Sequence, residues 1–295
     1  MPIFTQIMSE LKMITNVTRI TALIFAIATI TTNVKAQDII YENADSIFIE
    51  EIARKHPNEK HKATGERIIA IANEFIGEKY IAETLEKYEN EPLFISCSKL
   101  DCTTFVELVL AIAASKESSF TEICHTLEQI RYRNGVRNGY TSRLHYISWW
   151  IEDEAKQNVV EEIKTVQHTA TQKLNLNFMS THHDSYKHLK GNWQSIKEIA
   201  NMERPYRNID VKYIPKNNIK NIGKNDIKDG DIIAIVTATE GLDVSHIGLA
   251  NWSNNELHMM HASSAAGKVI NDTTSLNEYL AKKKNHLGIR VFRAL

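Results

Sequence analysis

Two hydrophobic patterns divide the chain, a helical one in its first half and a strand-like one near its end. Apolar residues recur every three or four positions in 64–76 and again in 102–114, which predicts a helix in each segment. From Ile227 the pattern changes to short apolar runs separated by turn residues, which is typical of strands. Strands are predicted at 231–237, 244–250, 256–262, 268–271 and 288–292, with one helix at 275–283. Helices followed by an antiparallel meander predict an α+β fold, with the helices packed on the C-terminal sheet.

The segment between these two halves, residues 118–210, has mainly helical patterns. Helices are predicted at 120–133, 148–161 and 190–203. The segment is also rich in tyrosine, tryptophan, histidine and arginine, which a plain connector would not need. We therefore interpret it as a helical insertion that forms part of a ligand site. Trp149 and Trp150 could stack on a ligand, but we expect them to pack the insertion onto the core, because large aromatic side chains are mostly buried.

Residues 1–36 have the pattern of a secretory signal peptide. Lys12 and Arg19 precede an apolar run that is too short to span a bilayer. Small residues then offer a cleavage site near Ala36. An uncleaved membrane anchor is the alternative, and the shortness of the apolar run disfavours it. We expect an exported, periplasmic protein whose mature chain, residues 37–295, forms one domain.

The charge pattern narrows the range of partners. The full chain has a formal net charge of −1, and its longest basic run, 282–284, fits a solvated helix end. Nucleic-acid binding therefore has no support in the sequence. No later stretch of 18 apolar residues follows the presequence, so we expect no stable membrane insertion. We expect a monomer that needs no cofactor.

One of the three cysteines lies where a helix begins. Asp101 is a suitable N-cap for the helix that starts at Cys102, and the N-terminus of a helix favours a thiolate. Cys97 and Cys124 lack such surroundings, and we interpret both as buried apolar side chains. A bridge between these two cysteines is an alternative that the sequence does not decide.

Two histidines fall on predicted strands downstream of this cysteine. His246 would hold the Cys102 thiolate as an ion pair and then protonate a departing nitrogen, and His261 would fix the tautomer of His246. A lone histidine on a strand is more often a satisfied core residue. Two strand histidines together with a capped helical cysteine favour a cysteine hydrolase instead.

These motifs resemble those of one enzyme family. Asp101-Cys102-Thr103-Thr104-Phe105-Val106 and His246-Ile247-Gly248-Leu249 are similar to the cysteine and histidine signatures of the NlpC superfamily of cell-wall cysteine hydrolases. His261-Ala262-Ser263 resembles its third catalytic position, and Tyr80 the tyrosine that precedes the cysteine and lines the site. The resemblance implies a papain-like core and a peptidoglycan or muropeptide substrate.

The departures from that family pattern point to one subfamily. The glycine pair that usually follows the tyrosine is replaced by Ile81-Ala82, and 144 residues separate Cys102 from His246. The segment Tyr140-Thr141-Ser142-Arg143-Leu144-His145-Tyr146 resembles an exported subfamily with N-acetylmuramoyl-L-alanine amidase activity. That resemblance implies a substrate site that includes Tyr80, Tyr140, Arg143 and His145. Arg143 is suited to clamp a stem-peptide carboxylate through two hydrogen bonds.

Other functions remain open at this point. An endopeptidase that cuts the D-glutamyl–diamino acid bond of the stem peptide would use the same catalytic residues, and a muropeptide-binding protein could keep the fold without turnover. A metal site is disfavoured, because His258 and His261 point to opposite faces of one strand. The cluster of His182, His183 and His188 has no glutamate placed for catalysis. We therefore expect no metal.

Overall fold

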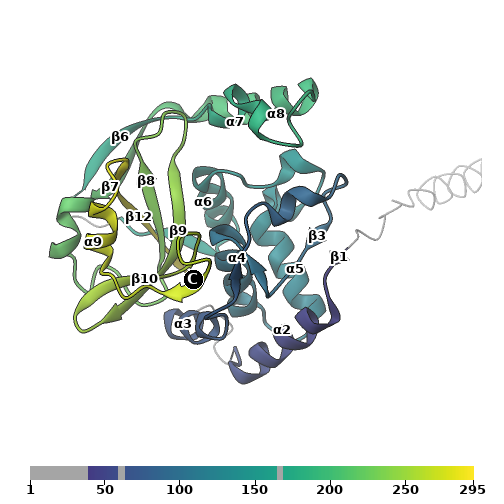
Figure 1. Ribbon diagram of the computed structural model, residues 1–295. Coiled ribbons are helices and arrows are strands. Elements are labelled where there is room, and N and C mark those ends of the chain that lie inside the picture. The colour runs from purple at the N-terminus through teal and green to yellow at the C-terminus, as the bar shows by residue number, and fades with distance from the viewer. Residues whose placement is uncertain (1–38, 59–63, 165–168) are drawn as a thin grey trace, which may run out of the picture. The chain divides into compact units, whose positions relative to one another are not determined.

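The computed structural model describes residues 39–58, 64–164 and 169–295 (Figure 1). The expected signal peptide and its cleavage site near Ala36 lie outside the described residues. The described helices are α2 (Asn43–Lys55), α3 (Gly65–Asn73), α4 (Cys102–Ala114), α5 (Phe120–Arg131), α6 (Ile147–Lys156), α7 (Phe178–Thr181), α8 (Trp193–Glu203) and α9 (Leu276–Ala281). The α4 and α9 helices lie within two residues of their predicted bounds.

The strands form one large sheet and one small one. Their bounds are β1 (Ile39–Ile40), β2 (Lys79–Tyr80), β3 (Leu93–Phe94), β4 (Lys99–Leu100), β5 (Val160–Glu162), β6 (Ala170–Asn175), β7 (Arg207–Pro215), β8 (Ile232–Thr237), β9 (Val244–Ser253), β10 (Glu256–Ser263), β11 (Lys268–Asn271) and β12 (His286–Ala294). The large sheet has the order β4-β2-β11-β10-β9-β8-β12-β7-β6, with β5 paired to β12, and β1 pairs with β3 separately.

The α+β class is confirmed, but the large sheet is mixed rather than antiparallel. The strands of the C-terminal meander pair antiparallel as predicted. At one edge, however, β2 and β4 from the N-terminal half pair in parallel. The chain leaves β2 and returns through the short 3₁₀ helix Thr84–Lys87 and β3 before it enters β4 in the same direction. The edge of the sheet therefore leads straight into α4.

The prediction of a mainly helical insertion is wrong for part of residues 118–210. This segment holds α5 to α8, but it also contributes β5, β6 and the start of β7. The helix expected to run to residue 161 ends at Lys156, and Asn158, with φ of 58°, turns the chain into β5. Because β5 and β7 both pair with β12, the segment is built into the large sheet.

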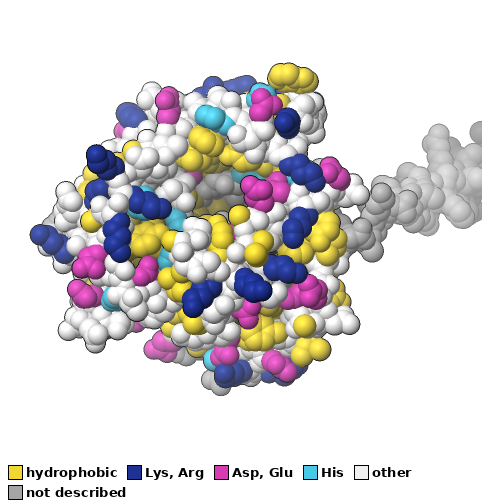
Figure 2. Space-filling model, in the orientation of Figure 1, with side chains coloured by type: hydrophobic (Ala, Val, Ile, Leu, Met, Phe, Trp, Pro, Cys, Tyr) yellow, Lys and Arg dark blue, Asp and Glu magenta, His cyan; other side chains and the backbone are white. Residues whose placement is uncertain are grey.

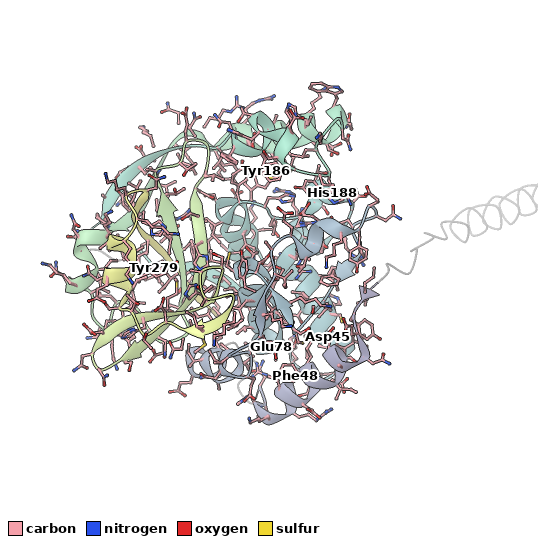
Figure 3. All side chains as sticks on the ribbon, viewed as in Figure 1. Asp45, Phe48, Glu78, Tyr186, His188 and Tyr279 are labelled. Carbon is pink, nitrogen blue, oxygen red and sulfur yellow. The ribbon has the colours of Figure 1, made fainter. Side chains whose placement is uncertain are left out.

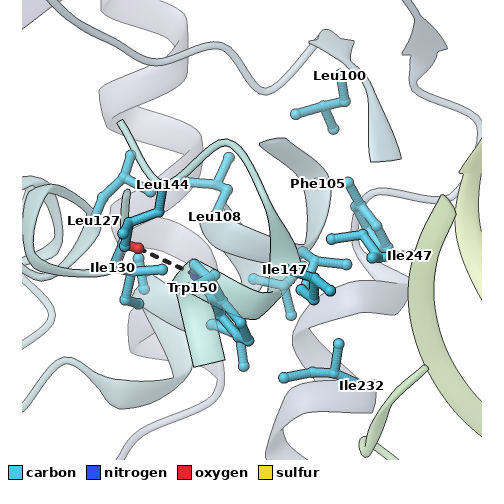
Figure 4. Packing of buried hydrophobic residues seen from close by; sticks show 14 of the residues in the cluster. Leu100, Phe105, Leu108, Leu127, Ile130, Leu144, Ile147, Trp150, Ile232 and Ile247 are labelled. Carbon is cyan, nitrogen blue, oxygen red and sulfur yellow. Dashed lines mark hydrogen bonds between the residues drawn. The ribbon is translucent and has the colours of Figure 1, made fainter. Parts of the chain in front are cut away.

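The main core lies between the helices and one face of the sheet. Figure 4 shows Phe105 of α4 beside Ile247 of β9, with Trp150, Ile130 and Leu127 further along the same cluster. Trp150 donates its indole N–H to the carbonyl of Ile130 at 3.1 Å. Trp149 and Trp150 are 1% and 5% exposed, so the packing interpretation of this pair is confirmed. A second cluster covers the opposite face of the sheet, under α9.

Helix α4 begins as its sequence predicts. The Asp101 carboxylate accepts the backbone N–H of Thr104 at 2.8 Å, and the Thr104 hydroxyl accepts the N–H of Asp101 at 2.9 Å. This reciprocal capping box satisfies two of the groups that a helix start leaves unpaired. Cys102 is therefore fixed as the first helical residue, directly after edge strand β4.

Candidate active site

The thiol of Cys102 lies against strand β9. It accepts hydrogen bonds from the backbone N–H of Ile247 and from Thr103. Three strands separate β4 from β9 in the sheet order, so the sheet must curve to bring the start of α4 to β9.

The contact with β9 is possible because β9 and β10 part at this point. Their ladder runs from Glu256 opposite Ser253 to Met260 opposite Leu249 and ends there. Beyond that end, β10 continues alongside β11, with His261 opposite Ile270. The N–H of Ile247 is thus released from the ladder and is available to the thiol.

His246 and His261 form a hydrogen-bonded pair where the two strands part. Nε2 of His246 lies 2.6 Å from Nδ1 of His261, and the two rings meet edge to face at 85°. Gly248 allows this approach, because a Cβ at that position would lie 2.9 Å from Cβ of His261. The bond uses Nε2 of His246, which leaves Nδ1 as the nitrogen that can take a proton from a thiol.

Burial controls the charge of both groups. It raises the pKa of the Cys102 thiol to about 11, with a further contribution from the Asp101 carboxylate, which the hydrogen bonds from Ile247 and Thr103 only partly offset. Burial also lowers the pKa of His246 to about 3, aided by the nearby His261. Both directions favour a neutral thiol and a neutral imidazole, rather than the preformed ion pair expected from the sequence. Activation by proton transfer during attack fits this state.

A cavity of about 700 Å³ opens beside the first turn of α4. Its lining includes Asp101 and Thr103, which flank Cys102. The loop after β2 and the segments at 140–145 and 185–187 supply the other walls. Residues 140–145 and 185–187 fall within the sequence-predicted insertion, which therefore contributes to this cavity.

Three of the four residues expected to bind substrate line this cavity. They are Tyr140, Arg143 and His145. The fourth, Tyr80, lies near Cys102 and Asp101, and burial together with the field of these two groups raises its pKa. The structure therefore gathers all four around the start of α4.

Arg143 does not have the free guanidinium that a carboxylate clamp requires. Its Nε and Nη2 donate to the Glu91 carboxylate at 2.8 and 2.7 Å, and its Nη1 donates to Glu86 at 2.6 Å. Glu91 is 4% exposed and Arg143 is 7% exposed. Two internal carboxylates thus take the place expected for a substrate carboxylate, and Arg143 ties the cavity wall at 140–145 to the loop after β2.

The opposite rim of the cavity is held to the same loop. His188 contacts the carbonyl of Glu86 at 3.2 Å, and Lys187 pairs with Glu89 at 2.8 Å. The ring of Tyr140 packs between those of His145 and His188, with centroids 4.5 and 4.9 Å away. Figure 3 shows Tyr186 and His188 together on this segment, above the helical half.

Comparison with known proteins places this architecture in a family. The model of the AmiA-like, N-acetylmuramoyl-L-alanine amidase-like family matches residues 70–289. The chain belongs to this family. A crystal structure of an N-acetylmuramoyl-L-alanine amidase from Bacteroides uniformis is 36% identical with a TM-score of 0.75, and the match covers 78% of this chain and 98% of that one.

Two further structures resemble this AmiA-like chain. A proposed xylanase from Bacteroides fragilis is 42% identical with a TM-score of 0.72, and the match covers 75% of this chain and 98% of that one. A Legionella pneumophila protein is 24% identical with a TM-score of 0.63 over 85% and 94% of the two chains, and it shows the shared fold alone. None of the curated proteins that were compared matches this chain.

Several residues around the cavity and the histidine pair were not predicted from the sequence. Glu86 and Glu91 are partners of Arg143, and Tyr186 and Lys187 line the cavity. Asp272 lies behind His261, with 3.6 Å between its Oδ2 and Nε2 of the imidazole. Asp272 follows Ile270 by two residues, and Ile270 is paired with His261 across β10 and β11. Asp272 therefore lies on the same face as His261, in the diagonal position. The sequence alone could not predict this neighbour, because the prediction requires the register between β10 and β11.

Other features of the described ranges bear on partners. Cys97 and Cys124 are buried and unbridged, as expected for apolar side chains. Within residues 39–58, 64–164 and 169–295, no three histidine, cysteine, aspartate or glutamate side chains are grouped to hold a metal ion. None of the helices in these ranges has both the length and the apolar character needed to cross a bilayer. On the face seen in Figure 2, basic and acidic side chains are interspersed.

Proposed function

We propose that this chain is an N-acetylmuramoyl-L-alanine amidase of the NlpC superfamily, with a papain-like core and a catalytic set of Cys102, His246 and His261. One observation carries the proposal. The Cys102 thiol at the start of α4 lies by the backbone N–H of Ile247, the residue after His246, and His246 is hydrogen-bonded to His261 where β9 and β10 part. A cavity of about 700 Å³ lies beside this first turn of α4. Membership of the AmiA-like family supports the same reaction class.

In the proposed reaction the thiol attacks the lactyl carbonyl of N-acetylmuramic acid. As the C–S bond forms, the thiol proton passes to Nδ1 of His246, and His261 holds the resulting imidazolium through its Nδ1. The backbone N–H of Cys102 stabilises the oxyanion, since no intrahelical acceptor exists for the first N–H groups of α4. The C–N bond then breaks, and His246 returns the proton to the amino group of L-alanine. Water hydrolyses the thioester that remains.

The side chains proposed to contact the substrate lie at different distances from the thiol. Tyr80 lies by the thiol, while Tyr140 and His145 face the cavity further along. Burial and the neighbouring Arg143 lower the pKa of His145 to about 3, so it acts as a neutral hydrogen-bonding group. Arg143 contributes by fixing the wall that carries these two side chains.

The remaining parts of the proposal come from the sequence. The signal-like pattern of residues 1–36 supports an exported, periplasmic enzyme, where muropeptides and peptidoglycan occur. The proposed catalytic set consists of side chains alone, so the proposed reaction needs no cofactor. The enzyme is proposed to act as a monomer.

An endopeptidase acting inside the stem peptide is the second candidate, because the same thiol and histidines would serve it. The test is mass spectrometry of a disaccharide-tetrapeptide incubated with the mature protein. The amidase releases intact tetrapeptide and free disaccharide. A shortened peptide that stays on the sugar would instead establish the endopeptidase. A xylan oligosaccharide in parallel tests the activity proposed for the Bacteroides fragilis relative, and its cleavage would overturn the amidase assignment.

A further inference from the structure

The nitrogen of His261 that faces away from His246 is buried and points toward a carboxylate. His261 is 1% exposed, and among the described residues its Nε2 has no hydrogen-bond partner within normal distance. Oδ2 of Asp272 lies 3.6 Å from this nitrogen, and a small closure would make it a hydrogen bond. A buried N–H without an acceptor destabilises the fold, and the Asp272 carboxylate is the group placed to accept it.

Asp272 is itself held in place by the turn that follows β11. Its Oδ1 accepts the backbone N–H of Thr274 at 2.8 Å, and its own N–H donates to the carbonyl of Met259 at 3.0 Å. This leaves Oδ2 for the imidazole. On another side of the imidazole, the Tyr279 ring meets His261 edge to face, with centroids 5.7 Å apart. These contacts fix the orientation of the His261 imidazole relative to the Asp272 carboxylate.

These contacts fix where each proton lies. A carboxylate only accepts, so the His261 proton must be on Nε2, and Nδ1 of His261 becomes an acceptor. The 2.6 Å bond then requires that His246 donate from Nε2. In a neutral imidazole the second nitrogen is then unprotonated, so Nδ1 of His246 carries the lone pair that a thiol proton needs.

We propose that Asp272 is a positioning residue that sets the tautomers of both His261 and His246 and so prepares His246 to deprotonate Cys102. The catalytic consequence rests on the proposed function, whereas the tautomer assignment does not. During attack one proton moves from Sγ of Cys102 to Nδ1 of His246. The protons on Nε2 of His246 and Nε2 of His261 stay in place.

The decisive variant is Asp272→Asn. The asparagine carbonyl can still accept the N–H of Thr274, but its amide then presents a donor to Nε2 of His261. Both imidazoles must switch to the Nδ1–H tautomer, which blocks the nitrogen meant for the thiol proton. Nitrogen-15 NMR of the histidine rings reads the tautomers directly. We expect Nε2–H for both residues in the wild-type protein and Nδ1–H for both in the variant.

The control is Asp229→Asn. The Asp229 carboxylate accepts the backbone N–H of Trp252 at 2.6 Å, and Trp252 lies on β9, the strand that carries His246. The control variant should leave both tautomers as in the wild type. Wild-type His246 with its proton on Nδ1 would overturn the proposal, whether or not the Asp272 variant folds. Unchanged tautomers in a folded Asp272→Asn protein would overturn it as well.

Kinetics gives a second measurement. In Asp272→Asn, kcat should fall by about 10⁴-fold with little change in KM, which is the scale for a catalytic histidine held in the wrong tautomer. The rate of Cys102 alkylation by iodoacetamide should fall too, and it needs no substrate. Normal alkylation with switched tautomers would reject the link to Cys102. Failure of the amidase assignment would instead appear as a wild-type protein that is alkylated normally but leaves the muropeptide intact.

Discussion

At the scale of single residues, burial holds the groups around Cys102 in their neutral forms. The pKa of Cys102 is raised to about 11, that of His246 is lowered to about 3, and burial lowers the pKa of His261 as well. A neutral thiol becomes nucleophilic only as its proton leaves. The orientation of the His246 lone pair therefore matters more here than the attraction between two charges.

Replacing Arg143 tests whether it supports the cavity wall or binds substrate directly. Arg143→Ala should destabilise the fold by about 3–5 kcal/mol, because it leaves the buried Glu91 carboxylate without its cation. Thermal unfolding measures this loss. Arg54→Ala is the control, since it removes the 3.2 Å pair with Glu50 on the surface and should leave the unfolding midpoint nearly unchanged.

The two roles of Arg143 give different results. If Arg143 supports the cavity wall, Arg143→Ala should have a lower unfolding midpoint, and its KM should rise only because the wall becomes less rigid. A normal midpoint with a much higher KM would restore the direct clamp expected from the sequence and would contradict the role drawn from its contacts with Glu86 and Glu91.

At the scale of elements, the site depends on how closely β9 and β10 approach before they part. Gly248 sits at that point, and a Cβ there would lie 2.6 Å from Cγ of Met259 and 2.9 Å from Cβ of His261. Neither atom is the free end of a flexible chain in open space. The glycine is thus needed for close approach, although its φ is not positive.

Gly248→Ala should therefore push His261 away from His246. We expect a stability loss of about 1–3 kcal/mol, as for overpacking, and a fall in kcat larger than the change in KM. Gly223→Ala is the matched control, because a Cβ there meets only the Asp226 carboxylate at 4.0 Å. A folded Gly248→Ala protein with wild-type kcat would show that the spacing of the two strands is not critical.

The sequence predicted the elements with local signals and missed those that depend on distant partners. The bounds of α4 follow from its cap and its apolar spacing, and β9 and β10 follow from their apolar runs between turns. By contrast β5 is a strand only because β12 pairs with it, and its residues suit a helix equally well. Cys102, His246 and His261 were recognisable from short motifs. Asp272 and the partners of Arg143 depend on strand register and loop packing, which no short motif encodes.

At the scale of the whole molecule, buried titratable groups change the stability of the fold with pH, and a buried carboxyl and buried histidines do so in opposite directions. Burial raises the pKa of Glu154 to about 9, so the folded protein keeps a proton that the unfolded chain has lost above pH 4.5, and stability falls as pH rises toward 9. Burial lowers the pKa of His145 and of His246 to about 3, so the unfolded chain gains protons first, and stability falls as pH drops from 6.5 toward 3. The combined loss of stability is smallest near pH 6.5, because the two histidines dominate below that pH and Glu154 alone acts above it.

Glu154→Gln isolates the alkaline effect. Glutamine keeps the shape of the protonated acid and cannot ionise, so the variant should gain stability over the wild type as pH rises from 5 to 9. Thermal unfolding at both values measures the gain, which should reach several degrees at pH 9. An equal difference from the wild type at both pH values would mean that Glu154 ionises normally in the folded protein.

The central claim is that Cys102 is the nucleophile, and one comparison of variants tests it most directly. The release of tetrapeptide from a disaccharide-tetrapeptide is measured for the wild type, for Cys102→Ala and for Cys124→Ala, which truncates a buried cysteine on α5. We predict that Cys102→Ala remains folded and loses activity by more than about a thousandfold, while Cys124→Ala keeps most of it. A folded Cys102→Ala protein that releases tetrapeptide at the wild-type rate would contradict the account.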